Sequence, residues 1–490
     1  IMFYLILLFL SFIAYCFFIN RILGLPNGPP PLPLIGNMLS FQWDFDKKLL
    51  EWKEKYGRIF TIWIPFPVVV FGDHKVLTEE IGKNGDLYLG RRNPEQLMDI
   101  MAGGLCGLVF EENHIVKEQR RFALRTFHEL GFGSAKLEDT VYGYVQEVVA
   151  RWKKQNGQEI NVTDHLMCAT GNIIWNITFG VHLDFDDPLL PRFREIQQAS
   201  IPLMAGTYMQ YVEMFPIIRK FDFLFGNHAR RLHEILQESS NFVKEAIETT
   251  RNSFSSDDRP GSYIEAFLSE MKRREENGLN KGSFIEQQMV SAAFTIWGAG
   301  FDTTVTVLRA SIHYLINNPN VQRKLHDEID TKIGKRRIRF EDSKNLPYCS
   351  AFMQEMYRTT NVLPLNFFRK VLEDTVVEGH EIPEGTTILP QYSMVHMDPK
   401  EFERPDYFCP ERHLNAQGEF VKDPRITPFS MGKRSCIGES LARMEIFVMF
   451  CSYVQHLSFH SVSVIPPKLE FIPGFSRTPK PFTAIVKSRD

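Results

Sequence analysis

One apolar segment, from Ser283 to Ile316, most restricts what this chain can fold into. Hydrophobic side chains surround its middle on nearly every side, and Asn317-Asn318-Pro319 ends it. It begins with Ser283-Phe-Ile-Glu286, a pattern in which the serine and glutamate side chains satisfy free backbone donors at a helix start. A helix of these 34 residues is roughly 50 Å long. We therefore expect a buried helix that crosses an entire domain.

Shorter elements are predicted on both sides of this helix. Asn318-Pro319 is typical of a helix start and predicts a second helix to about Ile333. Further helices are expected from Asn345 to about Thr360 and from about residue 438, while β-branched and aromatic residues at 58–72 predict short strands. Helices and strands do not alternate regularly, so a doubly wound α/β fold is excluded. We expect one large, mainly α domain with small β-sheets.

The N-terminal residues are a candidate membrane anchor. Residues 2–19 carry no charge and are almost wholly apolar, which is about the length that crosses a bilayer. A cleaved signal peptide is the alternative, but this stretch is longer than usual and no small-residue cleavage pattern follows it. We assign residues 1–20 to a single-pass transmembrane anchor, 21–40 to a proline-rich hinge and 41–490 to the folded domain. Arg21, just after the stretch, favours a cytosolic domain.

Cysteines and charge exclude several classes of protein. The seven cysteines are widely spaced and form no C-x-x-C pair, which argues against a disulfide framework or a zinc site and favours a reducing compartment. The N-x-T sequons at Asn161 and Asn176 are then expected to be unglycosylated. A formal net charge of −3 with a pI near 6.6 gives no indication of nucleic-acid binding.

One cysteine lies in a setting that suits metal ligation. The segment from Phe429 to Gly438 reads FSMGKRSCIG, and its Cys436 immediately precedes a predicted helix, whose N-terminus stabilises a thiolate. Gly432 and Gly438 permit unusual backbone conformations and the close approach of a flat ligand. Arg434 suits an anionic carboxylate, and Phe429 can keep water from the sulfur. These are the requirements of a thiolate ligand to haem iron; the alternative is a buried structural cysteine in a glycine-rich turn.

The same segment matches every fixed position of F-x-x-G-x-R-x-C-x-G, the haem-binding signature of the cytochromes P450, and the chain resembles that family. The resemblance implies the cytochrome P450 fold, a haem domain with iron protoporphyrin IX as cofactor, and Cys436 as the axial iron ligand. Glu355-x-x-Arg358 and the Arg412 of a P-E-R stretch also match family motifs. The resemblance implies that these three residues form a buried structural charge cluster that holds the thiolate loop.

The middle of the long apolar segment contains residues that disfavour a buried helix. Gly298 and Gly300 each cost about 1 kcal/mol relative to alanine, and a buried Asp302 is costly as well. Such departures are typical of functional sites. The sequence AGFDTT from Ala299 resembles the family's oxygen-activation motif, which implies a local helix distortion and a proton relay through Asp302 and Thr303. The alternative is a kinked core helix with a hydrogen-bonded aspartate.

Two arginines are candidates for binding the haem propionates, and one family position differs. Arg120 occupies the arginine position of the family's W-x-x-x-R motif, but Val116 stands where tryptophan is expected. The resemblance therefore implies that one propionate hydrogen bond is missing. Arg369, which precedes Asp374, is the second candidate by similar placement.

A basic stripe accompanies Arg120 on another face of its predicted helix. It consists of Lys117, Arg121 and Arg125, and Lys433 can extend it. The stripe is either an ordinary solvated face or a docking surface for an acidic electron donor. In microsomal members of the family the donor is NADPH–cytochrome P450 reductase, sometimes with cytochrome b5.

The resemblance implies a monooxygenase that inserts one oxygen atom of O2 into a small lipophilic substrate, such as a xenobiotic, fatty acid or steroid. The hinge sequence LPNGPPPLPLIGN looks most like microsomal members, which implies the endoplasmic reticulum membrane and contact with lipid. Residues 90–110 and 198–225 are expected to form pocket walls. One alternative is a haem-thiolate isomerase or dehydratase that uses no reductase, against which Asp302 and Thr303 argue. Another is a non-enzymatic haem- or lipid-binding membrane protein, for which Val116 is the one indication.

Overall fold

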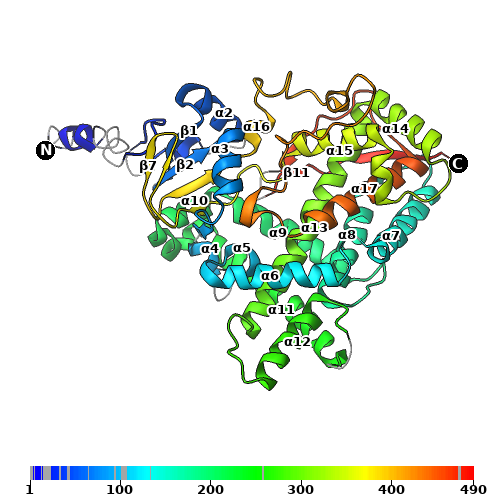
Figure 1. The fold of residues 1–490 in the computed structure, drawn as a ribbon, viewed down its shortest axis with the longest axis horizontal. Coiled ribbons are helices and arrows are strands. Elements are labelled where there is room, and N and C mark those ends of the chain that lie inside the picture. Colours follow the sequence, from blue (N-terminus) through cyan, green and yellow to red (C-terminus); the bar gives the residue numbers. More distant parts are fainter. Residues whose placement is uncertain are drawn as a thin grey trace.

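The fold is mainly helical with small sheets, as predicted (Figure 1). A computed structural model describes residues 4, 6–12, 14, 24–32, 35–40, 45–64, 66–92, 95–100, 107–132, 134–255, 259–472 and 476–489. The α-helices are α2 (Phe45–Tyr56), α3 (His74–Val76), α4 (Glu95–Ile100), α5 (Gly107–Phe110), α6 (Asn113–Glu129), α7 (Ala135–Lys154), α8 (Val162–Phe179), α9 (Leu189–Ala205), α10 (Thr207–Met214), α11 (His228–Ser253), α12 (Tyr263–Glu276), α13 (Glu286–Asn317), α14 (Pro319–Lys332), α15 (Pro347–Thr360), α16 (Ser393–His396) and α17 (Glu439–His456). Short helical turns are η1 (Met38–Ser40), η2 (Leu77–Lys83), η3 (Pro216–Phe225), η4 (Phe340–Lys344), η5 (Pro410–His413) and η6 (Gly432–Arg434).

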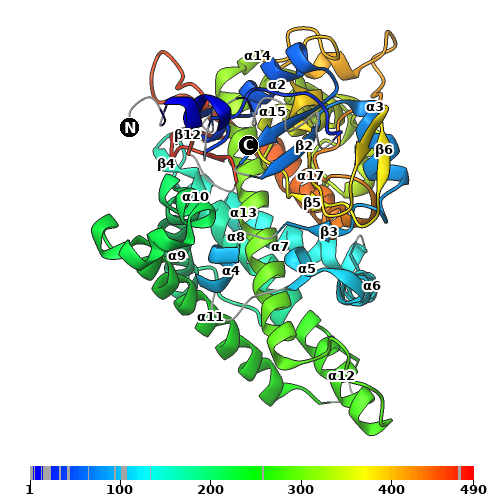
Figure 2. The ribbon, with the colours of Figure 1, turned by 90° about the vertical axis from the view of Figure 1, so that its left-hand side faces the viewer.

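The predicted long helix is α13, and it crosses the molecule from the α12 end to the α14 end (Figure 2). Its predicted capping box is wrong. The helix begins at Glu286 and its N-cap residue, Ile285, makes no side-chain cap hydrogen bond. Ser283 instead donates to Glu118 of α6 at 2.5 Å, and Glu286 accepts from Arg251 of α11 at 2.7 Å. Partners on neighbouring helices have replaced the local cap.

The glycine in the middle of α13 permits close helix packing. A Cβ atom built on Gly300 would lie 2.8 Å from both Cδ1 and Cγ1 of Ile174 in α8, closer than real carbon contacts. The helix is continuous from Glu286 to Asn317, so the expected local distortion is not observed. Gly300 thus explains how α8 and α13 approach each other, which is the most extensive helix contact in the described chain.

The shorter helices after α13 agree with the sequence prediction. Proline occupies the first turn of α14 and of α15, where its missing N–H costs nothing. Helix α15 packs between α13, α14 and the C-terminal part of the chain, and Phe352 stacks on Phe450 of α17 with ring centroids 4.5 Å apart. These helices form the rigid block on which the cysteine loop rests.

Four small sheets complete the described part of the fold. The strands are β1 (Ile59–Trp63), β2 (Pro67–Phe71), β3 (Gly90–Arg91), β4 (Glu159–Asn161), β5 (Arg369–Lys370), β6 (Thr375–Val377), β7 (His380–Ile382), β8 (Thr387–Pro390), β9 (Leu457–His460), β10 (Phe471–Ile472), β11 (Thr478–Pro479) and β12 (Thr483–Ser488). The largest sheet has the order β1-β2-β8-β5-β3, and the others are β4-β12-β9, β6-β7 and β10-β11. The predicted strands within 58–72 are β1 and β2, paired antiparallel with Ile59 opposite Phe71.

Most of the predicted anchor, residues 1–20, lies outside the described residues. Among the residues that are described, no helix is both long and apolar enough to cross a membrane. The N-terminal residues lie at the side of the molecule that carries β1, β2 and β7 (Figure 1). The division into anchor, hinge and domain remains a prediction.

Candidate functional site

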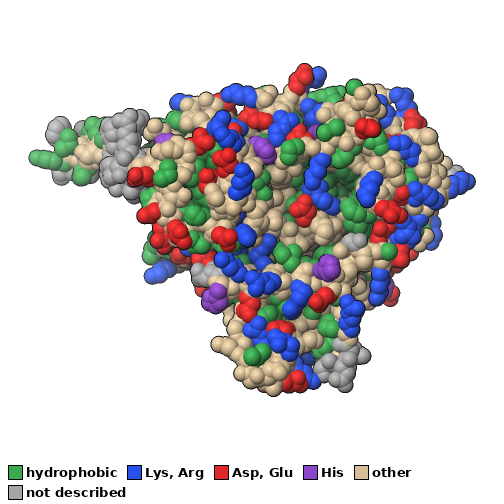
Figure 3. All heavy atoms as spheres, in the orientation of Figure 1, with side chains coloured by type: hydrophobic (Ala, Val, Ile, Leu, Met, Phe, Trp, Pro, Cys, Tyr) green, Lys and Arg blue, Asp and Glu red, His purple; other side chains and the backbone are tan. Residues whose placement is uncertain are grey.

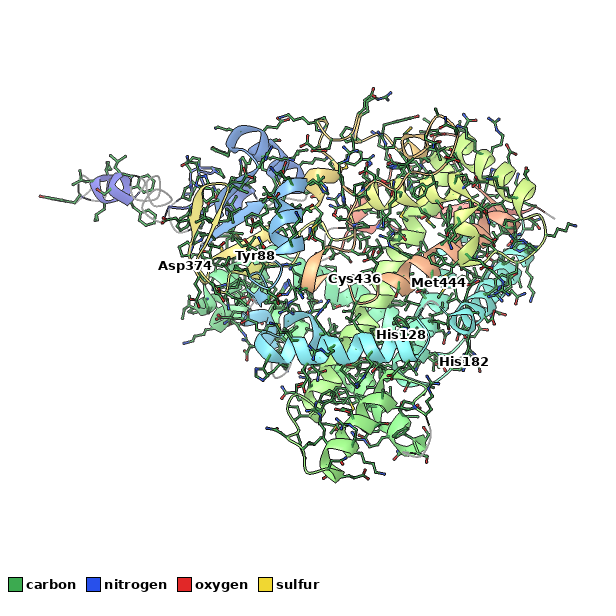
Figure 4. The ribbon with its side chains drawn as sticks, in the orientation of Figure 1. Tyr88, His128, His182, Asp374, Cys436 and Met444 are labelled. Carbon is green, nitrogen blue, oxygen red and sulfur yellow. The ribbon has the colours of Figure 1, made fainter. Side chains whose placement is uncertain are left out.

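The cysteine loop is shaped by one required glycine. Gly432 has φ +70°, and a Cβ on it would lie 1.9 Å from the carbonyl oxygen of Ile81 in η2, so only glycine fits there. Gly438, by contrast, has φ −93°, which other residues adopt readily. The backbone N–H of Cys436 donates to the carbonyl oxygen of Phe429 at 2.9 Å. The loop thereby closes on itself and presents Cys436 beside the start of α17 (Figure 4).

The Cys436 side chain is accessible, although protein surrounds it. Burial raises the pKa of the thiol, while the backbone N–H of Gly438, Arg120 and Arg443 oppose this rise. A Cβ on Gly438 would lie 4.0 Å from the Cys436 sulfur, an ordinary van der Waals distance. Protein atoms thus surround an accessible thiol, a setting in which a bound cation can displace its proton.

Phe429 covers one side of this loop. Its ring packs edge to face on Tyr357, with centroids 5.6 Å apart. The guanidinium of Arg443 lies 4.7 Å from the ring centroid. The Phe429 ring is therefore held between α15 and α17. That it keeps water from the sulfur remains a prediction.

Four arginines converge near the loop: Arg91, Arg120, Arg369 and Arg434. None of them forms an ion pair with a carboxylate in the described part of the chain. Burial, together with the charges of Arg120 and Arg369, lowers the pKa of Arg434 to about 9. Burial likewise lowers the pKa of Arg120 to about 10. So much uncompensated positive charge requires an anion.

Several donors of these arginines lack a partner among the described residues. Arg434 donates to the carbonyl oxygens of Leu89 and Glu111, yet its Nη1 has no acceptor. Arg369 donates through Nη2 to Ser430 Oγ at 3.2 Å, and its Nε and Nη1 have none. Arg120 donates to the carbonyl oxygen of Ser435 at 2.5 Å. Two carboxylates on a flat ligand would fit these free donors.

Sequence reasoning missed Arg91, the residue of β3 whose pKa is lowered by burial and by the other three arginines. It donates to the carbonyl oxygens of Val109 and Phe368. Its position in the sequence, beside Arg92, resembles that of an exposed surface pair. Nothing short of the tertiary structure distinguishes it.

One face of α13 is accessible although the helix is central. Apart from Gly300, which packs on Ile174, the accessible or half-buried residues in the middle of the helix are Phe294, Thr295, Gly298, Ala299, Asp302 and Thr303. Their spacing places them on one side. Phe301 does not belong to this face, because it is buried in the main hydrophobic core. The accessible face carries an acid and an alcohol at neighbouring positions, Asp302 and Thr303.

The acid and the alcohol have separate partners. Thr303 Oγ1 donates to the carbonyl oxygen of Ala299 at 2.8 Å. Asp302 Oδ2 accepts from Ser476 Oγ at 2.5 Å. Burial raises the pKa of Asp302, while the Ser476 hydrogen bond and the charge of Arg309 oppose the rise. Ser476 was not predicted, because it lies in an irregular segment without a recognisable motif.

The structure also brings together the three residues of the predicted charge cluster. Glu355 accepts from Arg358 at 2.7 and 2.8 Å and from Arg412 at 3.0 Å. His413, which the sequence did not single out, lies 2.9 Å from the same carboxylate, and the Cys409 N–H donates to it at 3.0 Å. Burial opposes ionisation, but these partners, Arg358 first, hold the pKa of Glu355 at about 2.

Comparison with known proteins identifies the family. The family model described as Cytochrome P450 matches residues 26–486. The chain is 36% identical to the probable cytochrome P450 CYP36A1 of Caenorhabditis elegans, with 99% of each chain covered. It is 31% identical to cytochrome P450 2B19 of Mus musculus, covering 95% of this chain and 94% of the relative. This chain belongs to the cytochrome P450 family. Its fold is the P450 fold, and it is a haem-thiolate monooxygenase.

The residues of this P450 suit a haem. Cys436 supplies an accessible sulfur, and the arginine group supplies donors without acceptors. Val116, at the usual tryptophan position, is fully buried and has no polar group. Arg91, Arg120, Arg369 and Arg434 would therefore hold the propionates without a tryptophan donor.

The predicted basic stripe of this P450 lies on the surface. Lys117, Arg121, Arg125 and Lys433 are exposed, and Lys and Arg side chains gather over α6 in Figure 3. Lys117 and Lys433 lie 3.5 and 3.6 Å from the same carboxylate, that of Asp86. Helix α6 and the cysteine loop therefore share one basic surface.

Proposed function

We propose that this P450 oxygenates a small lipophilic substrate with electrons that pass from NADPH through a flavoprotein reductase. The observation that carries the proposal is that two chemically suited sites keep accessible side chains. One is the Cys436 sulfur. The other is the adjacent carboxylate and hydroxyl of Asp302 and Thr303 on α13.

Each residue has a role that follows from its contacts. The haem, when bound, supplies dioxygen binding and reduction, to which a thiolate ligand contributes electron density. Cys436 would hold the iron, and the four arginines would orient the ring through its propionates. Asp302 and Thr303 would move protons toward the oxygen. Glu355, Arg358 and Arg412 keep the loop in register with α15.

The electron donor is proposed to dock on the basic surface formed by α6 and Lys433. This surface lies next to the loop that carries Cys436, so the path for electrons is short. A reductase or cytochrome b5 with an acidic face would be steered to it by charge.

The protein is proposed to lie on the endoplasmic reticulum membrane with its catalytic domain in the cytosol. Apolar side chains in η3 are exposed to solvent, which is unusual for a large group of aromatic residues. They are Ile217, Phe221, Phe223, Leu224 and Phe225. These residues lie within 198–225, one of the proposed pocket walls, so a membrane-dissolved substrate would reach the pocket directly.

The test is the reduced, carbon monoxide difference spectrum, followed by turnover with NADPH and reductase. We expect the Soret band characteristic of thiolate ligation in the wild-type protein and its loss in Cys436→Ser. Cys409→Ser is the matched control. This half-buried thiol belongs to the N-cap residue of η5, outside the segment from Phe429 to Gly438. Product formation that needs neither NADPH nor reductase would favour the isomerase or dehydratase alternative instead.

A further inference from the structure

A second polar group extends from Asp302 along α13. Asp302, Thr306 and Arg309 are spaced i, i+4 and i+7, which places them on one face of the helix. The segment from Ser476 to Pro479, which includes β11, packs against this face. Arg309 Nη2 donates to the carbonyl oxygen of Pro479 at 2.6 Å.

The hydroxyl groups of this segment form a continuous series with the Asp302 carboxylate. Ser476 Oγ donates to Asp302 Oδ2 at 2.5 Å. The Ser476 and Thr478 hydroxyl oxygens lie 3.3 Å apart, and those of Thr478 and Thr306 lie 3.5 Å apart. Every step is within hydrogen-bond distance, so a proton can move along the series without movement of the backbone.

Burial separates the middle of the series from its two ends. Ser476 is 4% exposed and Thr306 is fully buried, whereas Asp302 and Thr478 are both half-buried. The buried Ser476 hydroxyl therefore connects two residues that each keep some exposed surface. Thr306 and Arg309 hold β11 against α13 and do not themselves reach water, because both are buried.

Two neighbouring groups favour the ionised form of the Asp302 carboxyl. Arg309 from the same helix and Ser476 from the packed segment are the two groups that oppose the rise in its pKa. The charge of Asp164, in α8, raises the pKa of Arg309 and so favours its charged form. Asp302 is thus held ready to take up a proton and to release it, as a relay requires.

We propose that Ser476 positions the Asp302 carboxylate and delivers protons to it from Thr478. In each transfer a hydroxyl gives its proton to the next oxygen and accepts one from the oxygen behind it, so the residues are unchanged afterwards. Water at Thr478 is the source, and Thr303 is the acceptor beyond Asp302. The inference rests on the proposed function of Asp302. It adds a positioning role for Ser476, which comes from a different part of the chain.

The test compares Ser476→Ala with Ser476→Thr, which keeps the hydroxyl, and with Ser463→Ala, an exposed serine elsewhere in the chain. We expect Ser476→Ala to lose about tenfold of its product per NADPH consumed, which is the effect of one hydrogen bond to a charged group. Hydrogen peroxide should rise in compensation and the solvent isotope effect should increase. Ser476→Thr should retain most of the wild-type coupling.

A second measurement needs no turnover. Infrared titration of the Asp302 carboxyl, identified by subtraction of Asp302→Asn, should show a higher pKa in Ser476→Ala than in the wild-type protein. An unchanged pKa and unchanged coupling would overturn the role of Ser476. Loss of the thiolate Soret band in the wild-type protein would instead overturn the proposed function, while the infrared result would still decide whether Ser476 holds Asp302.

Discussion

Glu355 and Arg358 form a two-point ion pair with both side chains fully buried. The three-residue spacing on α15 brings them to one side of the helix. Arg412 and His413 of η5 then approach the same carboxylate from the segment that leads to the cysteine loop. A single carboxylate thus joins α15 to η5, and its loss would disturb both.

Replacing Arg358 by methionine should therefore destabilise the protein by about 3–5 kcal/mol, because a buried charge loses its main partner. Urea unfolding measures the free energy of unfolding directly. Arg273→Met is the control, since Arg273 pairs with Glu270 at the same spacing on α12 but is 54% exposed. Its removal should cost less than about 1 kcal/mol. Equal effects of the two variants would contradict the prediction.

A different carboxyl should make stability depend on pH. Burial raises the pKa of Glu445 in α17 from 4.5 to about 8, so between these values the folded protein holds a proton that the unfolded chain has released. Stability should then fall as the pH rises through this window, with Glu445 contributing about 1.4 kcal/mol per pH unit. Glu445→Gln should remove this contribution. Unfolding free energies at pH 5.5 and 7.5, compared between the two proteins, test the difference in slope.

The arginine group predicts opposite effects on the protein with and without haem. Arg369 is buried and two of its nitrogens have no partner, so Arg369→Leu should raise the stability of the haem-free protein by about 1 kcal/mol. The same change should speed haem release about tenfold, because a charged hydrogen bond is lost. Transfer of haem to a globin scavenger measures the release rate. Arg121→Leu, on the surface of α6, is the control and should change neither quantity. If haem-free Arg369→Leu were less stable than the wild-type protein, repulsion among the four arginines would not be the dominant effect.

Charge reversal should reveal the surface that meets the electron donor. Lys117→Glu and Lys433→Glu should each slow the first electron transfer from reductase, and the loss should shrink as salt is added. Stopped-flow reduction under carbon monoxide measures the rate without substrate turnover. Lys480→Glu provides the control, because Lys480 is exposed but lies beside β11. Equal slowing by the control would indicate a general charge effect.

The sequence was most informative where local chemistry decides structure. Proline at the start of α14 and the apolar length of α13 predicted those two helices closely. It was least informative where partners come from distant segments. The cap expected of Ser283 was lost to Glu118, and Arg91, His413 and Ser476 acquire their settings only through packing. Spacing identifies a motif, but it does not reveal which side chain from another element completes it.

Gly300 gives a final test of how the helix motif is built. A methyl group at this position would meet Ile174 at 2.8 Å, so Gly300→Ala should cost about 1–3 kcal/mol despite the better helix propensity of alanine. Ile174→Ala removes both contacting carbons. The double variant should therefore be more stable than the sum of the two single changes predicts, by at least about 1 kcal/mol. Urea unfolding of all four proteins measures this coupling. Simple additivity would mean that Gly300 serves a flexible helix rather than the close approach of α8.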